Sequence, residues 1–281
     1  MHVDGFVHLI KLKKLICERC NSLINIFQYL SNLEDLDINS NIITDGAFLK
    51  LIKLKKLIMR ECDLITDNVF QYLTKLEELE INSCINISGI RFQKLSRLEN
   101  LKIHYCNLIT GEGFENFTNL KELTIAECEN ITDKLFNNLC NLKTLHIIYY
   151  FEPEPAHNLL TENAFNNLLN LNKLYLYNYP ITNDAFKNLT NLKNLTINYN
   201  DNITDDVFIY LNNLEILELL YCTYITKKGI NLLTNIEKLT LVDCDRIQYS
   251  AFENLKKLKE IHIYSEEKNL SDYDYDIPRL Y

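Results

Sequence analysis

Apolar residues recur along this chain at a near-constant interval. The pattern Leu-x-x-Leu-x-Ile, or a close variant of it, occurs twelve times, in steps of 21 or 22 residues with a single step of 29. Alternation within a copy places two apolar residues, such as Leu123 and Ile125, on the same face of an extended segment. Each copy therefore predicts a short strand with one buried face. The copies begin at Leu12, Leu33, Leu54, Leu76, Leu98, Leu120, Leu142, Leu171, Leu192, Leu214, Ile236 and Leu258.

The segments between these strands also share an order. Ile-Thr is followed by Phe, and Leu comes three residues later, as in Phe136 and Leu139, which places both side chains on one face of a short helix. The Thr can cap the first N–H groups of that helix, and the acid or Asn that often follows suits its positive end. The Phe column holds Phe48, Phe70, Phe92, Phe114, Phe136, Phe165, Phe186, Phe208 and Phe252, and the Thr column holds Thr44, Thr66, Thr132, Thr161, Thr182 and Thr204.

This repeat resembles the leucine-rich-repeat superfamily over nearly the whole chain. Stretches such as Cys-Asp-Leu-Ile-Thr-Asp, from Cys62 to Asp67, resemble its cysteine-containing subclass. The Asn- and Ile-rich style also resembles leucine-rich-repeat and F-box/leucine-rich-repeat proteins of giant amoeba viruses, without the F-box. The resemblance implies an α/β solenoid, a horseshoe over residues 1–264, with a parallel β-sheet on its concave face and short helices on its convex face. Residues 265–281 leave the pattern and are expected to form a tail or a C-terminal cap.

Composition narrows the classes of partner. Hydrophobic residues make up 47% of the 281 residues, enough for a continuous core, and the formal net charge is −9. Because no basic stripe stands out, we expect no nucleic-acid partner. The sequence contains neither an apolar run long enough for a membrane span nor a signal-peptide pattern. We therefore expect a monomer that works in the cytoplasm, or in the host cytoplasm if the chain is viral.

Most of the cysteines fall into one column of the repeat, after the strand. Asn41 and Asn200 take the same place in other copies, which indicates a small buried group that hydrogen-bonds to the backbone. Metal ligands would converge on a point, whereas these residues form a line, so we expect structural thiols and no metal site. Unpaired buried thiols also suit a reducing compartment. The column holds Cys20, Cys62, Cys84, Cys106, Cys128, Cys222 and Cys244.

No catalytic motif is present in the sequence. The six histidines form no H-E-x-x-H arrangement, there is no G-x-S-x-G elbow, and six glycines do not build a phosphate loop. We therefore expect no enzymatic activity and no cofactor.

The residues between the buried strand positions must face the concave side, where they are free to vary. They are charged in the early copies and become rich in Tyr and His from the fifth copy onward. Tyr combines a large apolar ring with a polar tip and is enriched in interfaces, although Tyr can also simply fill turns. The candidate partner-binding residues are His104, Tyr105, His146, Tyr149, Tyr175, Tyr177, Tyr199 and Tyr221.

The single long copy carries about seven extra residues between Tyr150 and Leu160. Because they follow a strand, they should project from the rim beside the concave face, where Glu152 and Glu154 would contact a partner of apolar and basic character. The alternative is an insertion that is merely tolerated at this position.

These observations favour a non-enzymatic scaffold for protein–protein interaction, with a partner protein held on the concave face. The alternative implied by the resemblance is the substrate-recognition subunit of a ubiquitin ligase. Residues 1–11 cannot form an F-box, so that role would need a separate F-box-like partner.

Overall fold

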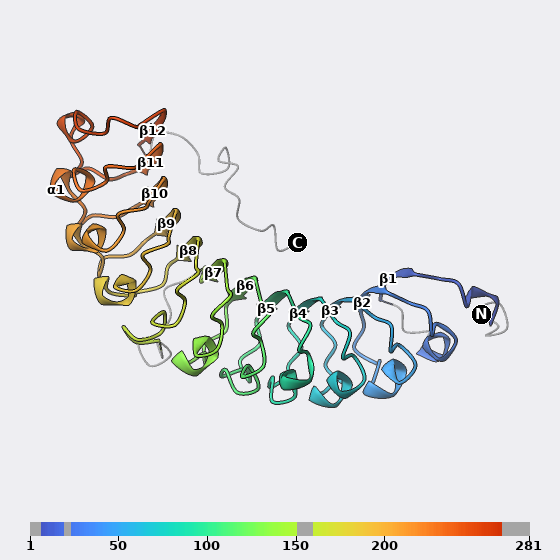
Figure 1. The fold of residues 1–281 in the computed structure, drawn as a ribbon. Coiled ribbons are helices and arrows are strands. Elements are labelled where there is room, and N and C mark those ends of the chain that lie inside the picture. Colours follow the sequence, from blue (N-terminus) through green and yellow to red (C-terminus); the bar gives the residue numbers. More distant parts are fainter. Residues whose placement is uncertain (1–6, 20–23, 151–159, 266–281) are drawn as a thin grey trace.

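The computed structural model describes residues 7–19, 24–150 and 160–265. They form a curved solenoid in which each repeat contributes one strand to the inner wall and one turn to the outer wall (Figure 1). The predicted horseshoe, with its sheet on the concave face, is confirmed. At about 4.8 Å between neighbouring strands, the sheet lines roughly 50 Å of the inner wall.

The sheet contains twelve strands, and their order in the sheet is their order in the chain. Every described pairing is parallel, and equivalent residues of successive repeats face each other, as Leu123 faces Leu101 and Leu145. The strands are β1 (Lys14–Glu18), β2 (Asp35–Asn39), β3 (Lys56–Arg60), β4 (Glu78–Asn82), β5 (Asn100–His104), β6 (Glu122–Ala126), β7 (Thr144–Ile148), β8 (Lys173–Tyr177), β9 (Asn194–Asn198), β10 (Ile216–Leu220), β11 (Lys238–Val242) and β12 (Glu260–Tyr264).

The core lies between the sheet and the outer turns. Leu123 and Ile125 are almost completely buried, as the alternation predicts. The Phe column stacks behind them, with the ring of Phe92 centred 4.9 Å from that of Phe70 and 5.5 Å from that of Phe114. One repeat cannot cover these side chains alone, so each turn of the solenoid completes the interior of its neighbour.

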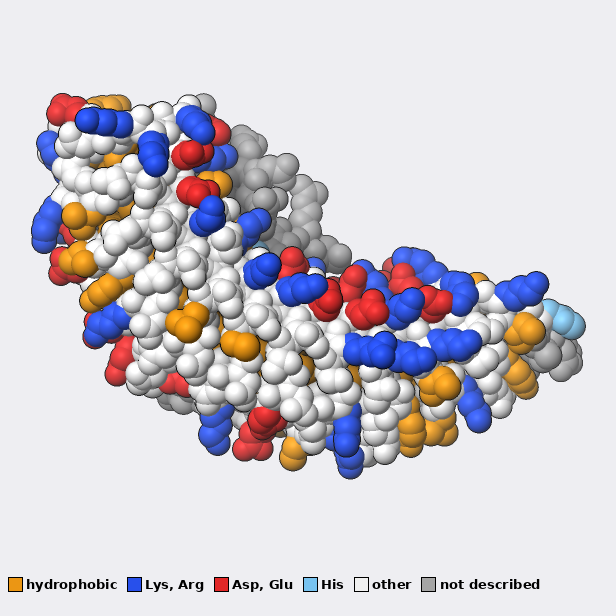
Figure 2. Space-filling view, viewed as in Figure 1, with side chains coloured by type: hydrophobic (Ala, Val, Ile, Leu, Met, Phe, Trp, Pro, Cys, Tyr) orange, Lys and Arg blue, Asp and Glu red, His pale blue; other side chains and the backbone are white. Residues whose placement is uncertain are grey.

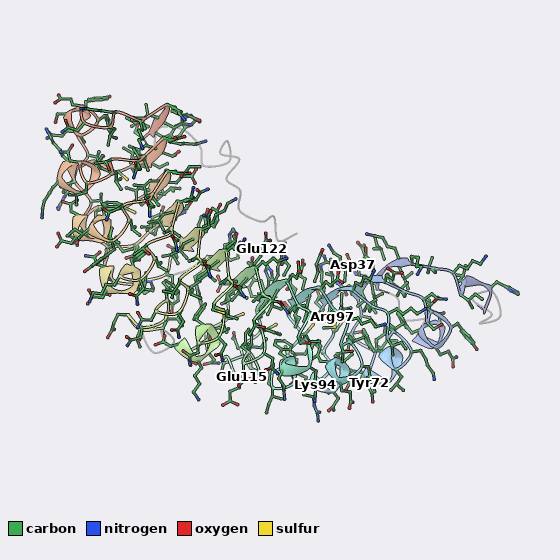
Figure 3. All side chains as sticks on the ribbon, in the orientation of Figure 1. Asp37, Tyr72, Lys94, Arg97, Glu115 and Glu122 are labelled. Carbon is green, nitrogen blue, oxygen red and sulfur yellow. The ribbon has the colours of Figure 1, made fainter. Side chains whose placement is uncertain are left out.

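The outer wall is built from single helical turns, in agreement with the short helices that the sequence predicts. All but one of the described turns are 3-10 helices, because a repeat of 21 or 22 residues leaves only a few residues for the outer wall. Figure 3 shows Tyr72, Lys94 and Glu115 pointing outward from this wall. The turns are η2 (Val7–Leu9), η3 (Ile24–Tyr29), η4 (Asp45–Phe48), η5 (Asp67–Gln71), η6 (Phe92–Lys94), η7 (Asp133–Phe136), η9 (Asn183–Phe186), η10 (Asp205–Ile209), α1 (Lys227–Ile230) and η11 (Tyr249–Ala251).

The Thr residues before these turns bind mainly across repeats. Thr66 donates its hydroxyl to Asp45 Oδ2 at 2.6 Å and its backbone N–H to Oδ1 at 2.8 Å. The acid that we expected to act on its own helix therefore binds the next repeat instead. Thr66 and Thr161 also accept local capping bonds, as expected. The prediction of local caps is wrong for Thr44, Thr132, Thr182 and Thr204, whose side chains make none.

Asparagine forms a second ladder between repeats. The Asn directly before the first Leu of a copy donates its side-chain amide to a backbone carbonyl of the preceding repeat, as from Asn141 to Thr118 at 2.7 Å. The same bond recurs at Asn119, Asn170, Asn191, Asn213 and Asn235. The high Asn content thus satisfies carbonyl groups that the turns leave without an internal donor.

The cysteine column forms a third ladder, which confirms its structural role. Cys128 Sγ donates to the carbonyl groups of Ala126 at 3.3 Å and Ile103 at 3.7 Å. Burial raises the pKa of the Cys106 thiol to about 11, so it stays protonated and can donate. The described cysteines of this column are free, as expected, whereas Cys17, which lies outside the column, is disulfide-bonded. Free thiols suit a reducing compartment and a disulfide suits an oxidising one, so the cysteines do not indicate the redox compartment. Cys20 lies outside the described residues.

Candidate functional site

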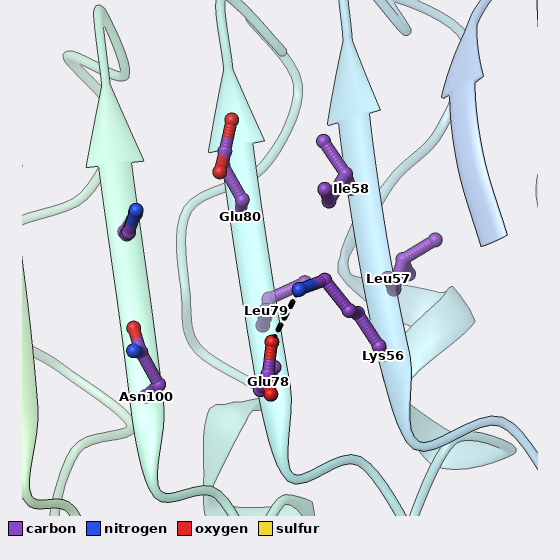
Figure 4. A pocket seen from close by; sticks show the side chains of 8 residues that line it. Lys56, Leu57, Ile58, Glu78, Leu79, Glu80 and Asn100 are labelled. Atoms are coloured by element: carbon purple, nitrogen blue, oxygen red, sulfur yellow. Dashed lines mark ion pairs between the residues drawn. The ribbon is translucent and has the colours of Figure 1, made fainter. Parts of the chain in front are cut away.

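The concave face of strands β1 to β5 is a lattice of ion pairs. Lys56 Nζ lies 2.6 Å from Glu78 Oε2 (Figure 4), and Arg60 contacts Asp37 on one side and Glu80 on the other. Figure 2 shows acidic and basic side chains interleaved over this half of the molecule. Exposed pairs of this kind stabilise little individually, but they leave few uncompensated charges for a ligand.

The hollow between β3, β4 and β5, drawn in Figure 4, is small. Its volume is about 200 Å³, and its walls are the ion-paired side chains of Lys56 and Glu78 together with Glu80 and Lys102. Pockets for drug-sized molecules or cofactors measure roughly 300–1,000 Å³. The volume of this hollow is therefore below the usual range for a drug-sized molecule or a cofactor.

From β6 onward the concave face changes its chemistry. At the ends of β6, β7 and β8 the side chains on this face are small, aliphatic or aromatic. Ala126, Ile148 and Tyr177 occupy equivalent places on β6, β7 and β8, and they form a hydrophobic cluster separate from the main core. Tyr175 packs against this cluster. The predicted change from charged to aromatic character is therefore present in the structure.

Two aromatic pairs bridge neighbouring repeats on this side. The rings of His146 and Tyr175 stack with centroids 4.2 Å apart, and those of Tyr199 and Tyr221 stack at 4.1 Å. Tyr199 and Tyr221 directly follow β9 and β10 with φ of 50° and 55°, a left-handed conformation that is uncommon for residues other than glycine. Tyr199 is 47% exposed, so this pair presents aromatic surface to solvent.

The structure buries three of the residues that we expected to contact a partner. Tyr149 is 4% exposed and donates its hydroxyl to the carbonyl oxygen of Cys128 at 2.6 Å. Its ring lies in the interior beside Tyr179, with the two ring centroids 5.3 Å apart. His104 and Tyr177 face the concave side but are 0% and 7% exposed. The predicted surface position is therefore wrong for all three.

The other expected residues divide into two groups. Tyr105, His146, Tyr175, Tyr199 and Tyr221 are at least partly exposed. Glu152 and Glu154, in the long copy, lie outside the described residues.

The repeats match a known family. A family model described as the BspA type leucine rich repeat region matches residues 22–143 and 158–276, in six copies. The chain belongs to the BspA-type leucine-rich-repeat family. The match covers both halves of the solenoid and passes over residues 144–157, where the long copy interrupts the period. No curated protein matches the sequence.

Solved structures share the fold of this leucine-rich-repeat protein. An internalin from Listeria monocytogenes is 22% identical, with a TM-score of 0.59 over 96% of this chain and 90% of the internalin. The yeast complex of Rad7 and Elc1 is 19% identical, with a TM-score of 0.59 over 92% of this chain and 77% of the matched chain. The matched chain in a complex of TLR13 with ssRNA13 is 18% identical, with a TM-score of 0.57. The match covers 94% of this chain and 52% of the TLR13 complex chain. At these identities the likeness shows the fold alone.

Among the described residues, no three His, Cys, Asp or Glu side chains come together in a way that could hold a metal ion. Within the same ranges, every helix is too short or too polar to cross a bilayer.

His104 gives a testable dependence of stability on pH. Burial, and then the charges of Lys102 and Arg60, lower its pKa from 6.5 to about 4, and neither ring nitrogen has a hydrogen-bond partner among the described residues. The unfolded chain therefore takes up a proton first, so the folded state should lose stability as the pH falls from about 6.5 to about 4. Urea unfolding across this range should show a shallower loss for His104→Gln than for the wild type. Equal slopes would mean that His104 is solvated in the folded state.

Proposed function

We propose that this protein is a non-enzymatic scaffold that binds a partner protein on the concave face of strands β7 to β10. The observation that carries this proposal is the set of stacked aromatic side chains on a rigid parallel sheet. Leucine-rich-repeat proteins generally act as interaction scaffolds through such extended concave surfaces. Tyr and His rings at these places are typical of binding hot spots.

Rigidity supports the proposal energetically. Tyr199 and Tyr221 are held by stacking on each other and by strands that are paired on both sides. A partner that binds them does not have to order these side chains, so little of the interaction energy is lost to side-chain entropy.

Exposed tyrosines on other faces make a matched test possible. The double variant Tyr199→Ala/Tyr221→Ala should lose proteins that the wild type captures from a lysate of the source cell, and should bind the purified partner about tenfold or more weakly. The control Tyr224→Ala/Tyr249→Ala removes two tyrosines that are 47% and 83% exposed on other surfaces, and should retain the partner. Quantitative proteomics followed by calorimetry on the purified pair gives both measurements.

Two results of this experiment would contradict the proposal. One is undiminished binding by a correctly folded Tyr199→Ala/Tyr221→Ala variant. The other is an equal loss in the control, which would indicate nonspecific contact with exposed rings. The ligase-subunit alternative has no described residue that favours it, and co-purification with ligase core subunits would be needed to support it.

A further inference from the structure

A row of charged side chains follows the edge of the sheet where the strands begin. Along most of this edge, lysines and glutamates of neighbouring repeats form ion pairs. Glu34 lies between Lys13 and Lys55, and their hydrogen bonds lower the pKa of Glu34 to about 2. Lys259 pairs with Glu237 in the same way near the other end. Most charges on this part of the edge are thus compensated by a neighbouring repeat.

The compensation stops at β7 and β8. Lys143 directly precedes β7 and Lys173 begins β8, both are exposed, and neither forms an ion pair in the described part of the chain. The lysines on either side are engaged with acids further away: Lys121 with Glu99 at 2.6 Å and Lys193 with Glu215 at 2.7 Å. Two adjacent lysines therefore have no ion-pair partner among the described residues, although the net charge of the protein is −9.

These four lysines line one shallow hollow of about 660 Å³. The hollow contains one acid, Glu122, which accepts a hydrogen bond from Asn100 Nδ2 at 2.9 Å. We call Lys121, Lys143, Lys173 and Lys193 the lysine track. Lys173 and Tyr175 lie two residues apart on the same face of β8, so the track adjoins the stacked pair of Tyr175 and His146.

We propose that the lysine track binds an extended acidic segment of the partner protein, with an aromatic or apolar residue of that segment beside Tyr175. This inference rests on the proposed function and specifies the chemistry of the partner. An uncompensated cationic site on an acidic protein attracts anionic segments and repels basic ones. The expectation of a basic partner came from Glu152 and Glu154, whereas the described surface carries the opposite charge.

The dimensions agree with an extended peptide. Neighbouring strands lie about 4.8 Å apart, so the four repeats from Lys121 to Lys193 span roughly 15 Å. An extended peptide repeats its side chains on one face about every 6.6 Å, so two or three carboxylates can reach this row.

The test uses the full chain and a fluorescein-labelled peptide of alternating Glu and Tyr. Fluorescence anisotropy should show binding that weakens as salt rises from about 0.05 M to about 0.5 M. The variant Lys143→Glu/Lys173→Glu should bind about tenfold more weakly. The control Lys256→Glu/Lys257→Glu makes the same change in net charge at two exposed lysines between η11 and β12, and should change binding less than about twofold. Circular dichroism checks that both variants are folded.

Several outcomes would overturn the inference. One is equal binding of a peptide in which Lys replaces Glu, and another is tighter binding of a uridine-rich single-stranded RNA, which would identify a nucleic-acid site. A third uses a variant whose five acids in residues 266–281 are changed to amides. If that variant binds the probe about tenfold more tightly than the wild type, the occupant is the chain's own segment rather than a partner.

The lysine inference can also fail while the proposed function stands. That result would be a Lys143→Glu/Lys173→Glu variant that retains the partner which Tyr199→Ala/Tyr221→Ala loses. Loss of the partner from both double variants would support the two proposals together.

Discussion

Replacing Phe92 with alanine is expected to lower the free energy of unfolding by about 3–5 kcal/mol. The Phe92 ring is completely buried and packs against Phe70 and Phe114, with Phe117 at 6.0 Å between centroids. These rings come from three neighbouring repeats, so the surrounding side chains cannot close the cavity without shifting the repeats themselves. Urea unfolding followed by circular dichroism measures the loss.

The control for Phe92→Ala lies two residues away. Ile90 is 54% exposed, so Ile90→Ala should change the free energy of unfolding by less than about 0.5 kcal/mol. A loss of less than about 1 kcal/mol for Phe92→Ala would mean that the Phe column does not form the shared interior described above.

Replacing Asp67 with alanine should cost about 2–3 kcal/mol. Its carboxylate accepts the backbone N–H of Ser88 at 3.0 Å, the hydroxyl of Ser88 at 2.6 Å and the backbone N–H of Gly89 at 2.8 Å. Without it, two backbone donors of the next repeat lose their partner, and the bonds lost are charge-assisted. The same urea titration gives the size of the effect.

Two variants separate this effect from a general effect of charge. Asp67→Asn keeps one acceptor oxygen and should lose less than Asp67→Ala. Asp245→Ala removes an exposed acid and should change stability by less than about 0.5 kcal/mol. Equal losses for Asp67→Ala and Asp245→Ala would show that the inter-repeat bonds do not stabilise the fold.

The sequence predicts the strands and the core well because the repeat itself sets them. Leu123 and Ile125 alternate within one strand, and every copy repeats that alternation, so the period is sufficient to locate the buried face. The type of helix in the outer wall is harder to predict, because Phe and Leu at i,i+3 suit both an α-helix and the 3-10 turns that form.

The bonds between repeats could not be read from neighbouring residues. Asp45 and Thr66 lie 21 residues apart and meet only because the repeats stack. A Thr-Asp pair within one copy suggests a local helix cap. The sequence of a single copy does not show that the Asp side chain binds the Thr of the next copy. Aligning each acid with the Thr of the following copy would have exposed the ladder.

The same limit explains the errors in the candidate site. Strand position correctly places His104 and Tyr177 on the concave side, but it does not show that each is buried there. Lys143 and Lys173 look like part of an ordinary mixed surface, because acids and lysines alternate along the sequence. The pairing between repeats shows that these two lysines have no ion-pair partner in the described part of the chain.

The long copy keeps the bonds and the strand register that join regular repeats. Thr161 binds Asp133 through its N–H at 2.9 Å and its hydroxyl at 2.6 Å, as shorter repeats do, and β7 and β8 keep the register of Leu145 with Leu174. Both ends of the insertion, at Tyr150 and Leu160, are thus anchored in regular repeats. Protein engineers could replace residues 151–159 with a foreign epitope or an enzyme recognition sequence, and the flanking strands should hold such a graft without a change in pitch.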